Sequence, residues 1–265
     1  GTAMIAPPDL HLVLEPERVV LLRGPRENRH RPSVDVLFRS AAVTFGRRVT
    51  GVILSGMQDD GAAGLWAIKR RGGAAVVQQP DDAEYPDMPG NALAVVRVDA
   101  SVPMREMPAV LLRIARESVR EAPAPAPSNM EKEVRIVAAN GTTPDELDTL
   151  GQRVALTCPE CGGSLWEIDN GGPRYRCYNG HAYSLQTLAD EQTIQVEAAL
   201  WAGLRKLEES ERLAHRMAAH ARQRGNERSA SYHAEMAHST AQHAATLRQL
   251  LSEKGPAAPD PAANE

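Results

Sequence analysis

The sequence predicts the C-terminal part of an α/β domain with a doubly wound parallel sheet, followed by a small β module and an α-helical hairpin. The run Val49–Leu54 is mostly apolar and β-branched, as in a strand buried on both faces. A turn and a helix over about 62–71 follow it, and such alternation is typical of a parallel sheet covered on both faces. Far along the chain, leucines recur at helical spacing until Gly225–Asn226 interrupts them, which predicts two helices joined by a short turn.

The other elements of the first 118 residues follow from short apolar runs between prolines and polar turns. Pro32–Ser33 opens a helix with one apolar face, and the segment from Met104 to about Ser118 predicts an amphipathic helix. Further strands are predicted at 4–6, 12–14, 19–22, 74–77 and 95–98.

Composition divides the chain into five parts. The α/β part covers 1–118, and an Ala/Pro-rich and polar linker over 119–150 favours extended chain. A β module follows at 151–188, a helical hairpin at 189–254 and a disordered tail at 255–265. The linker predicts that the β module can unfold while the α/β part stays folded.

Bulk properties narrow the classes of function. The net charge of −4 gives no general attraction to nucleic acid or anionic lipid, and no apolar run is long enough to insert into a membrane. The chain begins at Gly1 inside a predicted strand, so we expect a fragment or a misplaced start.

All three cysteines of the chain lie in one region, as Cys158-Pro-Glu-Cys161 and Cys177-Tyr-Asn-Gly-His181. Two ligand pairs on two turns form a Cys₃His set, which structural Zn²⁺ prefers; the alternative is three free cysteines on loops. Four protein ligands close the coordination shell, so the ion is expected to hold the fold rather than to bind substrate. Clustered metal-type cysteines favour a reducing compartment, so we expect a cytoplasmic protein. The β module over 151–188, which the Cys₃His set indicates is a zinc ribbon, carries as many acidic as basic residues, so nucleic acid is not an expected partner.

The turn after Val49–Leu54 is the main candidate for chemistry, because active groups in open α/β sheets lie beyond the C-terminal ends of strands. It contains Asp59 and Asp60 ahead of a helix. One of these carboxylates is expected to cap a helix and the other to act in catalysis, and the residues alone leave the assignment open.

A second candidate is the basic loop over 24–32, which contains Asn28, Arg29, His30 and Arg31. Its arginines suit an acidic partner or substrate; the alternative is a solvated basic loop.

At these positions the chain closely resembles the chemotaxis methylesterase family, the CheB proteins. The matching segments are Ile5–Leu12 (IAPPDLHL), Glu27–Phe38 (ENRHRPSVDVLF), Leu54–Gly64 (LSGMQDDGAAG) and Met88–Pro89. The cysteine-containing segments 157–163 and 177–183 resemble a C-terminal extension found on a subset of such proteins.

The resemblance implies a protein-glutamate methylesterase that acts on methylated chemoreceptors and also deamidates glutamines. It implies that Asp60 is the acid of a Ser-His-Asp triad and that the Met57 backbone N–H is an oxyanion donor. Asn28, Arg29, His30 and Arg31 are then expected near the substrate groove.

The chain departs from the family pattern in one respect. It contains no Gly-rich turn with the family's serine, and the family's histidine lies upstream of the matched region. A different class of function therefore stays open, in which the zinc ribbon and helical hairpin form a non-catalytic interaction module. The hairpin is also expected to pair with the zinc ribbon or to self-associate with a second copy, because its alanine-rich second helix buries little apolar area.

Overall fold

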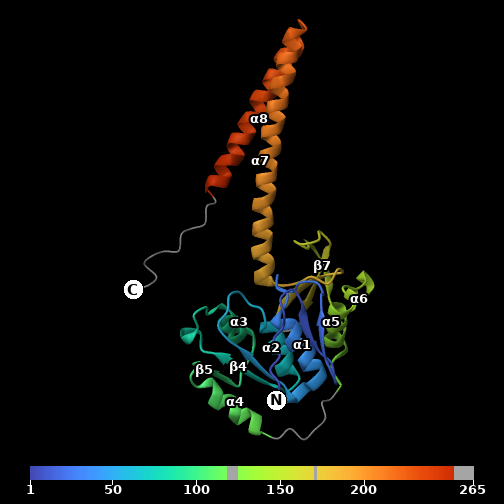
Figure 1. Ribbon diagram of the computed structural model, residues 1–265. Coiled ribbons are helices and arrows are strands. Elements are labelled where there is room, and N and C mark those ends of the chain that lie inside the picture. The colour runs from blue at the N-terminus through green and yellow to red at the C-terminus, as the bar shows by residue number, and fades with distance from the viewer. Residues whose placement is uncertain (118–124, 170–171, 254–265) are drawn as a thin grey trace. The chain divides into compact units, whose positions relative to one another are not determined.

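The computed structural model describes residues 1–117, 125–169 and 172–253. The chain divides into two compact units, residues 1–190 and 191–265. Figure 1 gives the order of the elements along the chain. The α/β part and the β module both belong to the first unit.

The α/β part contains a parallel sheet of strand order β3-β4-β5, formed by β3 (Thr50–Ile53), β4 (Ala74–Gln78) and β5 (Ala100–Val102). An antiparallel hairpin of β1 (His11–Leu14) and β2 (Val19–Leu22) precedes it. The helices of this part are α1 (Val34–Phe45), α2 (Ala62–Arg70), α3 (Asp87–Val95) and α4 (Met107–Arg116). The predicted α/β class with a parallel sheet is confirmed.

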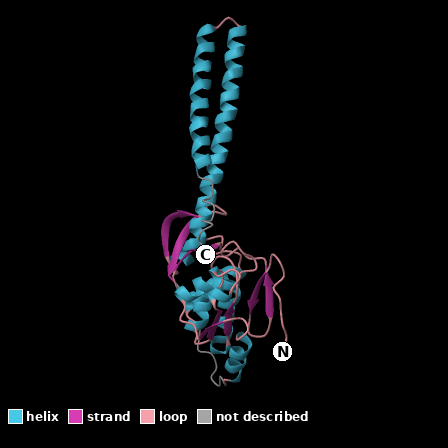
Figure 2. Ribbon diagram, turned by 90° about the vertical axis from the view of Figure 1, so that its left-hand side faces the viewer, coloured by secondary structure: helices cyan, strands magenta, loops and turns pink. Residues whose placement is uncertain are grey.

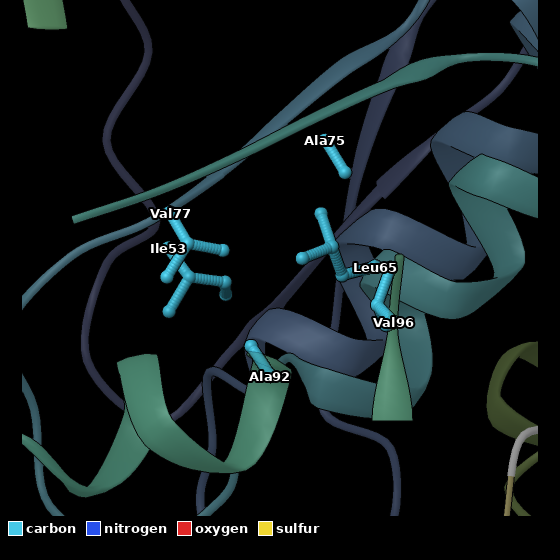
Figure 3. Close-up of a cluster of buried hydrophobic side chains, with 6 residues drawn as sticks. All are labelled: Ile53, Leu65, Ala75, Val77, Ala92 and Val96. Atoms are coloured by element: carbon cyan, nitrogen blue, oxygen red, sulfur yellow. The ribbon is translucent and has the colours of Figure 1, made fainter. Parts of the chain in front are cut away.

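The core of this part lies between the sheet and its helices. Ile53 and Val77 of the sheet pack with Leu65 of α2 and Ala92 of α3 (Figure 3). Where α1 crosses α2, a Cβ on Gly64 would lie 2.6 Å from Cβ of Phe38, so only glycine allows this close approach. The crossing brings the start of α1 beside the turn that follows β3.

Two of the predicted strands are wrong. Residues 95–98 do not form a strand: α3 continues to Val95, and the Val96 N–H still donates to the Ala92 carbonyl. The third parallel strand is β5, because Ala100 is the residue that pairs with Val76 of β4. Residues 4–6 form no strand, and the side chains of Met4 and Ile5 are exposed.

The range 119–150 is not a linker throughout. It contains α5 (Ser128–Ala138) and α6 (Pro144–Asp148), and α5 buries Met130, Ile136 and Val137. Met130 and Val137 pack against α1 and neighbouring side chains, whereas Ile136 packs with Leu147 and Trp166, and a solvated linker would make neither set of contacts. The first half of the Ala/Pro run, residues 122–124, lies outside the described residues.

The β module is an antiparallel sheet of order β6-β7-β8-β9. Its strands are β6 (Gln152–Thr157), β7 (Ser164–Asp169), β8 (Pro173–Cys177) and β9 (Ala182–Ser184). Ala182 of β9 forms a parallel bridge with Glu27 of the α/β part, and the Asn28 N–H donates to the Ala182 carbonyl at 2.8 Å. The β module is therefore docked directly onto the α/β part, which conflicts with the prediction that it unfolds separately.

Two long helices, α7 (Leu185–Gln223) and α8 (Glu227–Glu253), run side by side and confirm the helical hairpin (Figure 2). The seam between them is built of small side chains, since Ala214, Ala218 and Ala221 of α7 and Ala230, Ala237 and Ala244 of α8 are buried. Gly225 turns the chain with φ 72°, and the Asn226 side chain accepts from the Ser229 N–H at the start of α8. Across the described ranges, no helix combines the length and the apolar character needed to span a bilayer.

Candidate active-site turn and metal centre

Asp60 lies in the turn between β3 and α2, but its side chain caps α1. Its Oδ1 accepts from the Ser33 hydroxyl at 2.7 Å and from the Asp35 N–H at 3.2 Å. Its Oδ2 accepts from the Val34 N–H at 2.7 Å. Asp60 therefore satisfies the first N–H groups of α1, where a carboxylate is also favoured by the helix dipole.

Asp60 is only 6% exposed. Burial, and after it the neighbouring Asp35 carboxyl, raise its pKa to about 7, although the hydrogen bonds from Val34, Ser33 and Asp35 oppose the rise. Asp60 is thus a carboxyl group that changes its protonation state near neutral pH.

Asp59 has a different partner. Its Oδ1 accepts from the Thr187 hydroxyl at 2.9 Å, and this threonine lies in the first turn of α7. Neither aspartate caps α2, whose N-cap is Gly61 with no side-chain cap bond. The expectation that one aspartate caps the helix that follows the turn is therefore wrong: Asp60 instead caps α1, which precedes it in the chain.

The first part of the turn is open to solvent, with Leu54, Ser55 and Met57 exposed. Met57 is 64% exposed, and across the described residues no acceptor is bonded to its backbone N–H. The adjoining residues are fixed, because the Gln58 N–H donates to Asp87 and the Gly56 N–H donates to the Tyr85 carbonyl. The Met57 N–H is therefore available to a ligand.

The four predicted substrate-binding residues have different environments. Asn28 is 4% exposed, its Nδ2 donates to Asp35 and its Oδ1 accepts from the Ser184 N–H. Arg31 donates to Asp9 and to the Gly24 carbonyl. Both are used inside the fold, whereas Arg29 and His30 are exposed, with His30 hydrogen-bonded to Gln58. Arg29 and His30 are therefore the two of these four residues that face solvent.

No Ser-His-Asp relay is formed at Asp60 by the described residues. Ser33 donates to Asp60, but the nearby His11 accepts from the Ser33 backbone N–H and bonds to the Pro25 carbonyl. Both side chains are buried, so neither can reach a substrate. Ser55 is exposed in the same turn, and its hydroxyl accepts from the Tyr85 N–H.

A buried network of charges joins the α/β part to the β module, and we did not predict it from the sequence. Glu27 accepts from Arg39 of α1 at 2.9 Å and from Arg176 of β8 at 2.6 Å. Arg174 of β8 donates to Glu133 of α5 at 2.8 Å. The sequence signal was an Arg-x-Arg pair on one strand directly before the cysteine ligand Cys177.

Electrostatics keep this network ionised. Burial alone would raise the pKa of Glu27, but Arg176 and Arg39 hold it well below its usual range. Burial would also raise the pKa of Glu133, but the charges of Arg174 and Arg39 hold that pKa at about 2. These carboxylates stay charged at neutral pH, and the ribbon is docked by paired, desolvated ions.

The four predicted metal ligands lie together. The ligand atoms of Cys158, Cys161, Cys177 and His181 are all within 4.8 Å of one another. The Sγ atoms of Cys161 and Cys177 are 3.7 Å apart, and His181 Nδ1 lies 3.6 Å from the Sγ atoms of Cys158 and Cys177. A tetrahedral ion at Zn–S and Zn–N distances of about 2.3 and about 2.0 Å requires separations of about 3.8 and about 3.5 Å. The cluster fits a metal ion such as zinc.

The surroundings orient the histidine ligand. Its Nε2 lies 3.3 Å from Glu160 Oε2, and the other oxygen of Glu160 accepts from the Tyr183 hydroxyl. A carboxylate behind a ligating imidazole fixes the tautomer that presents Nδ1 to the ion. The two knuckles are closed by backbone bonds from Gly162 to the Cys158 carbonyl and from Gly180 to the Cys177 carbonyl.

Comparison with known proteins concerns the first part of the chain. Residues 1–111 match the family model described as CheB methylesterase. A protein-glutamate methylesterase/protein-glutamine glutaminase of Anaeromyxobacter dehalogenans is 42% identical over 120 residues, which cover 44% of this chain and 33% of that protein. A protein of the same name from Thiobacillus denitrificans is 44% identical over 112 residues, or 41% of this chain and 32% of that protein.

The chain spans only part of its relatives. A match to a Leptospira interrogans relative is 37% identical and covers 63% of that protein. The crystal structure of the Thermotoga maritima CheB methylesterase catalytic domain shares 27% identity, with a TM-score of 0.40, over 41% of this chain and 59% of that one. The match of residues 1–111 to the CheB methylesterase family confirms the resemblance carried by the sequence motifs of this part.

Proposed function

We propose that residues 1–111 supply the acid-bearing part of a protein-glutamate methylesterase that also deamidates glutamines on chemoreceptors. The observation that carries the proposal is the match of these residues to the CheB methylesterase family, with relatives of that name at about 40% identity. A buried carboxyl group and a free backbone donor in one turn after a parallel strand support it.

In the proposed reaction a serine hydroxyl attacks the ester carbonyl of a methylated glutamate while a histidine accepts its proton. Methanol leaves, and water releases the glutamate from the acyl-enzyme. Asp60 orients the histidine and stabilises it when charged. Three of the four lone-pair sites of its carboxylate accept hydrogen bonds from Ser33, Val34 and Asp35, so one site on Oδ2 remains for an imidazole N–H.

Two further groups complete the proposed site. The Met57 N–H would donate to the oxyanion of the tetrahedral intermediate. Arg29 and His30, exposed on the neighbouring loop, would meet acidic side chains around the methylation site of the receptor. Asn28 and Arg31 hold this loop and do not contact substrate in this proposal.

We also propose that the Cys₃His cluster holds one structural Zn²⁺. Four protein ligands leave no open position, so the ion would join the two knuckles and would take no part in ester hydrolysis. The protein is then expected in the cytoplasm, where thiols stay reduced.

The test of the proposed function is methanol release from methylated receptor. The chain is assayed alone and joined to a segment that carries the family's serine and histidine. Release is expected only from the joined protein, and replacement of the added serine by alanine should abolish it. Failure of the folded, joined protein to release methanol would contradict the proposal, and release by the chain alone would show that another residue is the nucleophile.

A further inference from the structure

One short segment at the junction of β9 and α7 contacts the α/β part at two points. The Ser184 N–H donates to Asn28 Oδ1 at 2.9 Å, and the Thr187 hydroxyl donates to Asp59 Oδ1 at 2.9 Å. Ser184 also caps the helix, because its hydroxyl accepts from the Thr187 N–H at 3.0 Å. Because Ser184 and Thr187 belong to the same capped helical turn, the two residues that make these contacts keep the same separation.

Both contacts lead to Asp60. Thr187 holds Asp59, which is covalently adjacent to Asp60. Asn28 donates to Asp35 Oδ2 at 3.0 Å, and the Asp35 N–H donates to Asp60 Oδ1 at 3.2 Å. The carboxylate is thus fixed from two directions by the segment that follows the β module.

The same segment is tied to the candidate metal ligands. His181 immediately precedes β9, and its carbonyl accepts from the Cys177 N–H at 3.0 Å. Coordination would replace nonbonded contacts between two knuckles with four metal–ligand bonds, and so would fix the start of β9.

We propose that metal binding at the Cys₃His cluster holds the Ser184–Thr187 segment in place and thereby positions Asp60, so that the extension acts as a metal-dependent latch on the candidate active-site turn. Thr187 and Asn28 are positioning residues in this latch. Its catalytic meaning rests on the proposed function, whereas the contacts that form it do not.

The buried ion pairs restrict the effect to the latch. Glu27 with Arg176, and Glu133 with Arg174, pair without using a metal-ligand side chain, so they are expected to keep the β module docked when the metal is lost. Metal loss is therefore expected to loosen β9 and the turns it contacts, while the parallel sheet keeps its hydrogen bonds.

Amide hydrogen exchange of the full chain tests this inference without an activity assay. The protein is measured loaded with Zn²⁺, after removal of metal by EDTA under reducing conditions, and after reloading. The reporters are the N–H groups of Val34 and Asp35, which donate to Asp60, and that of Ser184. Val76 and Val77 of β4 report on the sheet.

Metal removal is expected to speed exchange at the three reporters by about tenfold or more, to change the β4 amides by less than about twofold, and to be reversed by Zn²⁺. Thr187→Val should speed exchange at Val34 and Asp35 with metal still bound. Thr246→Val, which removes a hydroxyl from an exposed site on α8, should leave all of these amides unchanged.

Two results would overturn the latch. Unchanged exchange at Val34 and Asp35 in the metal-free protein would show that Asp60 is held independently of the metal. Equal acceleration throughout, β4 included, would show that the metal supports the whole unit instead of one turn. Either result leaves the proposed ester hydrolysis untouched, which methanol release tests separately.

Discussion

The buried carboxyl group of Asp60 should give this protein an unusual dependence of stability on pH. The perturbation is Asp60→Asn, which keeps the size of the side chain and removes its titration. The pKa of Asp60 in the folded chain is raised from 3.8 to about 7 because the group is buried and lies near Asp35. The folded state therefore binds this proton more tightly than the unfolded state does.

The sign and size of the effect follow from this shift. The stabilising contribution is fully present below about pH 4 and is lost as the pH rises to about 7. A shift of about 3 pKa units corresponds to about 4 kcal/mol as an upper value. Glu133 acts in the opposite direction, with a pKa of about 2, but its contribution is lost only below about pH 4.5.

Urea unfolding followed by circular dichroism between pH 4.5 and 7.5 measures the effect. The free energy of unfolding of the wild-type protein should fall relative to that of Asp60→Asn as the pH rises. Ser33→Ala removes a donor that lowers the pKa of Asp60, so its decline should extend to higher pH. Wild-type and Asp60→Asn curves that stay parallel over this range would refute the reasoning.

Three other predictions concern the extension. Arg176→Met should lower the free energy of unfolding by about 3 kcal/mol, because Glu27 and the Gly180 carbonyl lose a buried donor. The control Arg248→Met, at an exposed ion pair, should lower it by less than about 1 kcal/mol. Equal urea midpoints for the two variants would contradict this prediction. Elemental analysis should find one zinc per chain and far less in Cys161→Ser, and protein purified without chelator that holds no metal would exclude the site. The isolated hairpin 185–253 should sediment as an oligomer, because its alanine seam buries little area, and a stable, fully helical monomer would be the contrary result.

Periodicity and residue spacing predicted the parts of the fold whose structure depends mainly on residues close together in the sequence. The β-branched run at Val49–Leu54, the turn behind it and the α2 helix follow from periodicity, and the four metal ligands follow from spacing. The third strand could not be placed in this way. Val95–Val98 has the stronger β propensity, but pairing with β4 selects Ala100–Val102 and packing keeps Val95 in a helix.

Long-range partners explain what the sequence could not show at the candidate site. The sequence left Asp59 and Asp60 equivalent, and the fold separates them, since Asp60 caps α1 and Asp59 meets Thr187. Asn28 lies in a basic loop that suggested substrate binding, but its side chain links Asp35 of α1 to Ser184 of β9. Such bonds join residues far apart in sequence, so periodicity and spacing carry no signal for them.

Methanol release by the joined enzyme, compared between Asp60→Asn and Asp59→Asn, tests the central claim most directly. If Asp60 is the acid that orients the catalytic histidine, Asp60→Asn should lower kcat by about 10²–10⁴-fold, whereas Asp59→Asn should cost much less. Circular dichroism of both variants confirms that they are folded. A kcat that is indifferent to Asp60→Asn, or that falls equally in the two variants, would contradict the assignment of Asp60 as the catalytic acid.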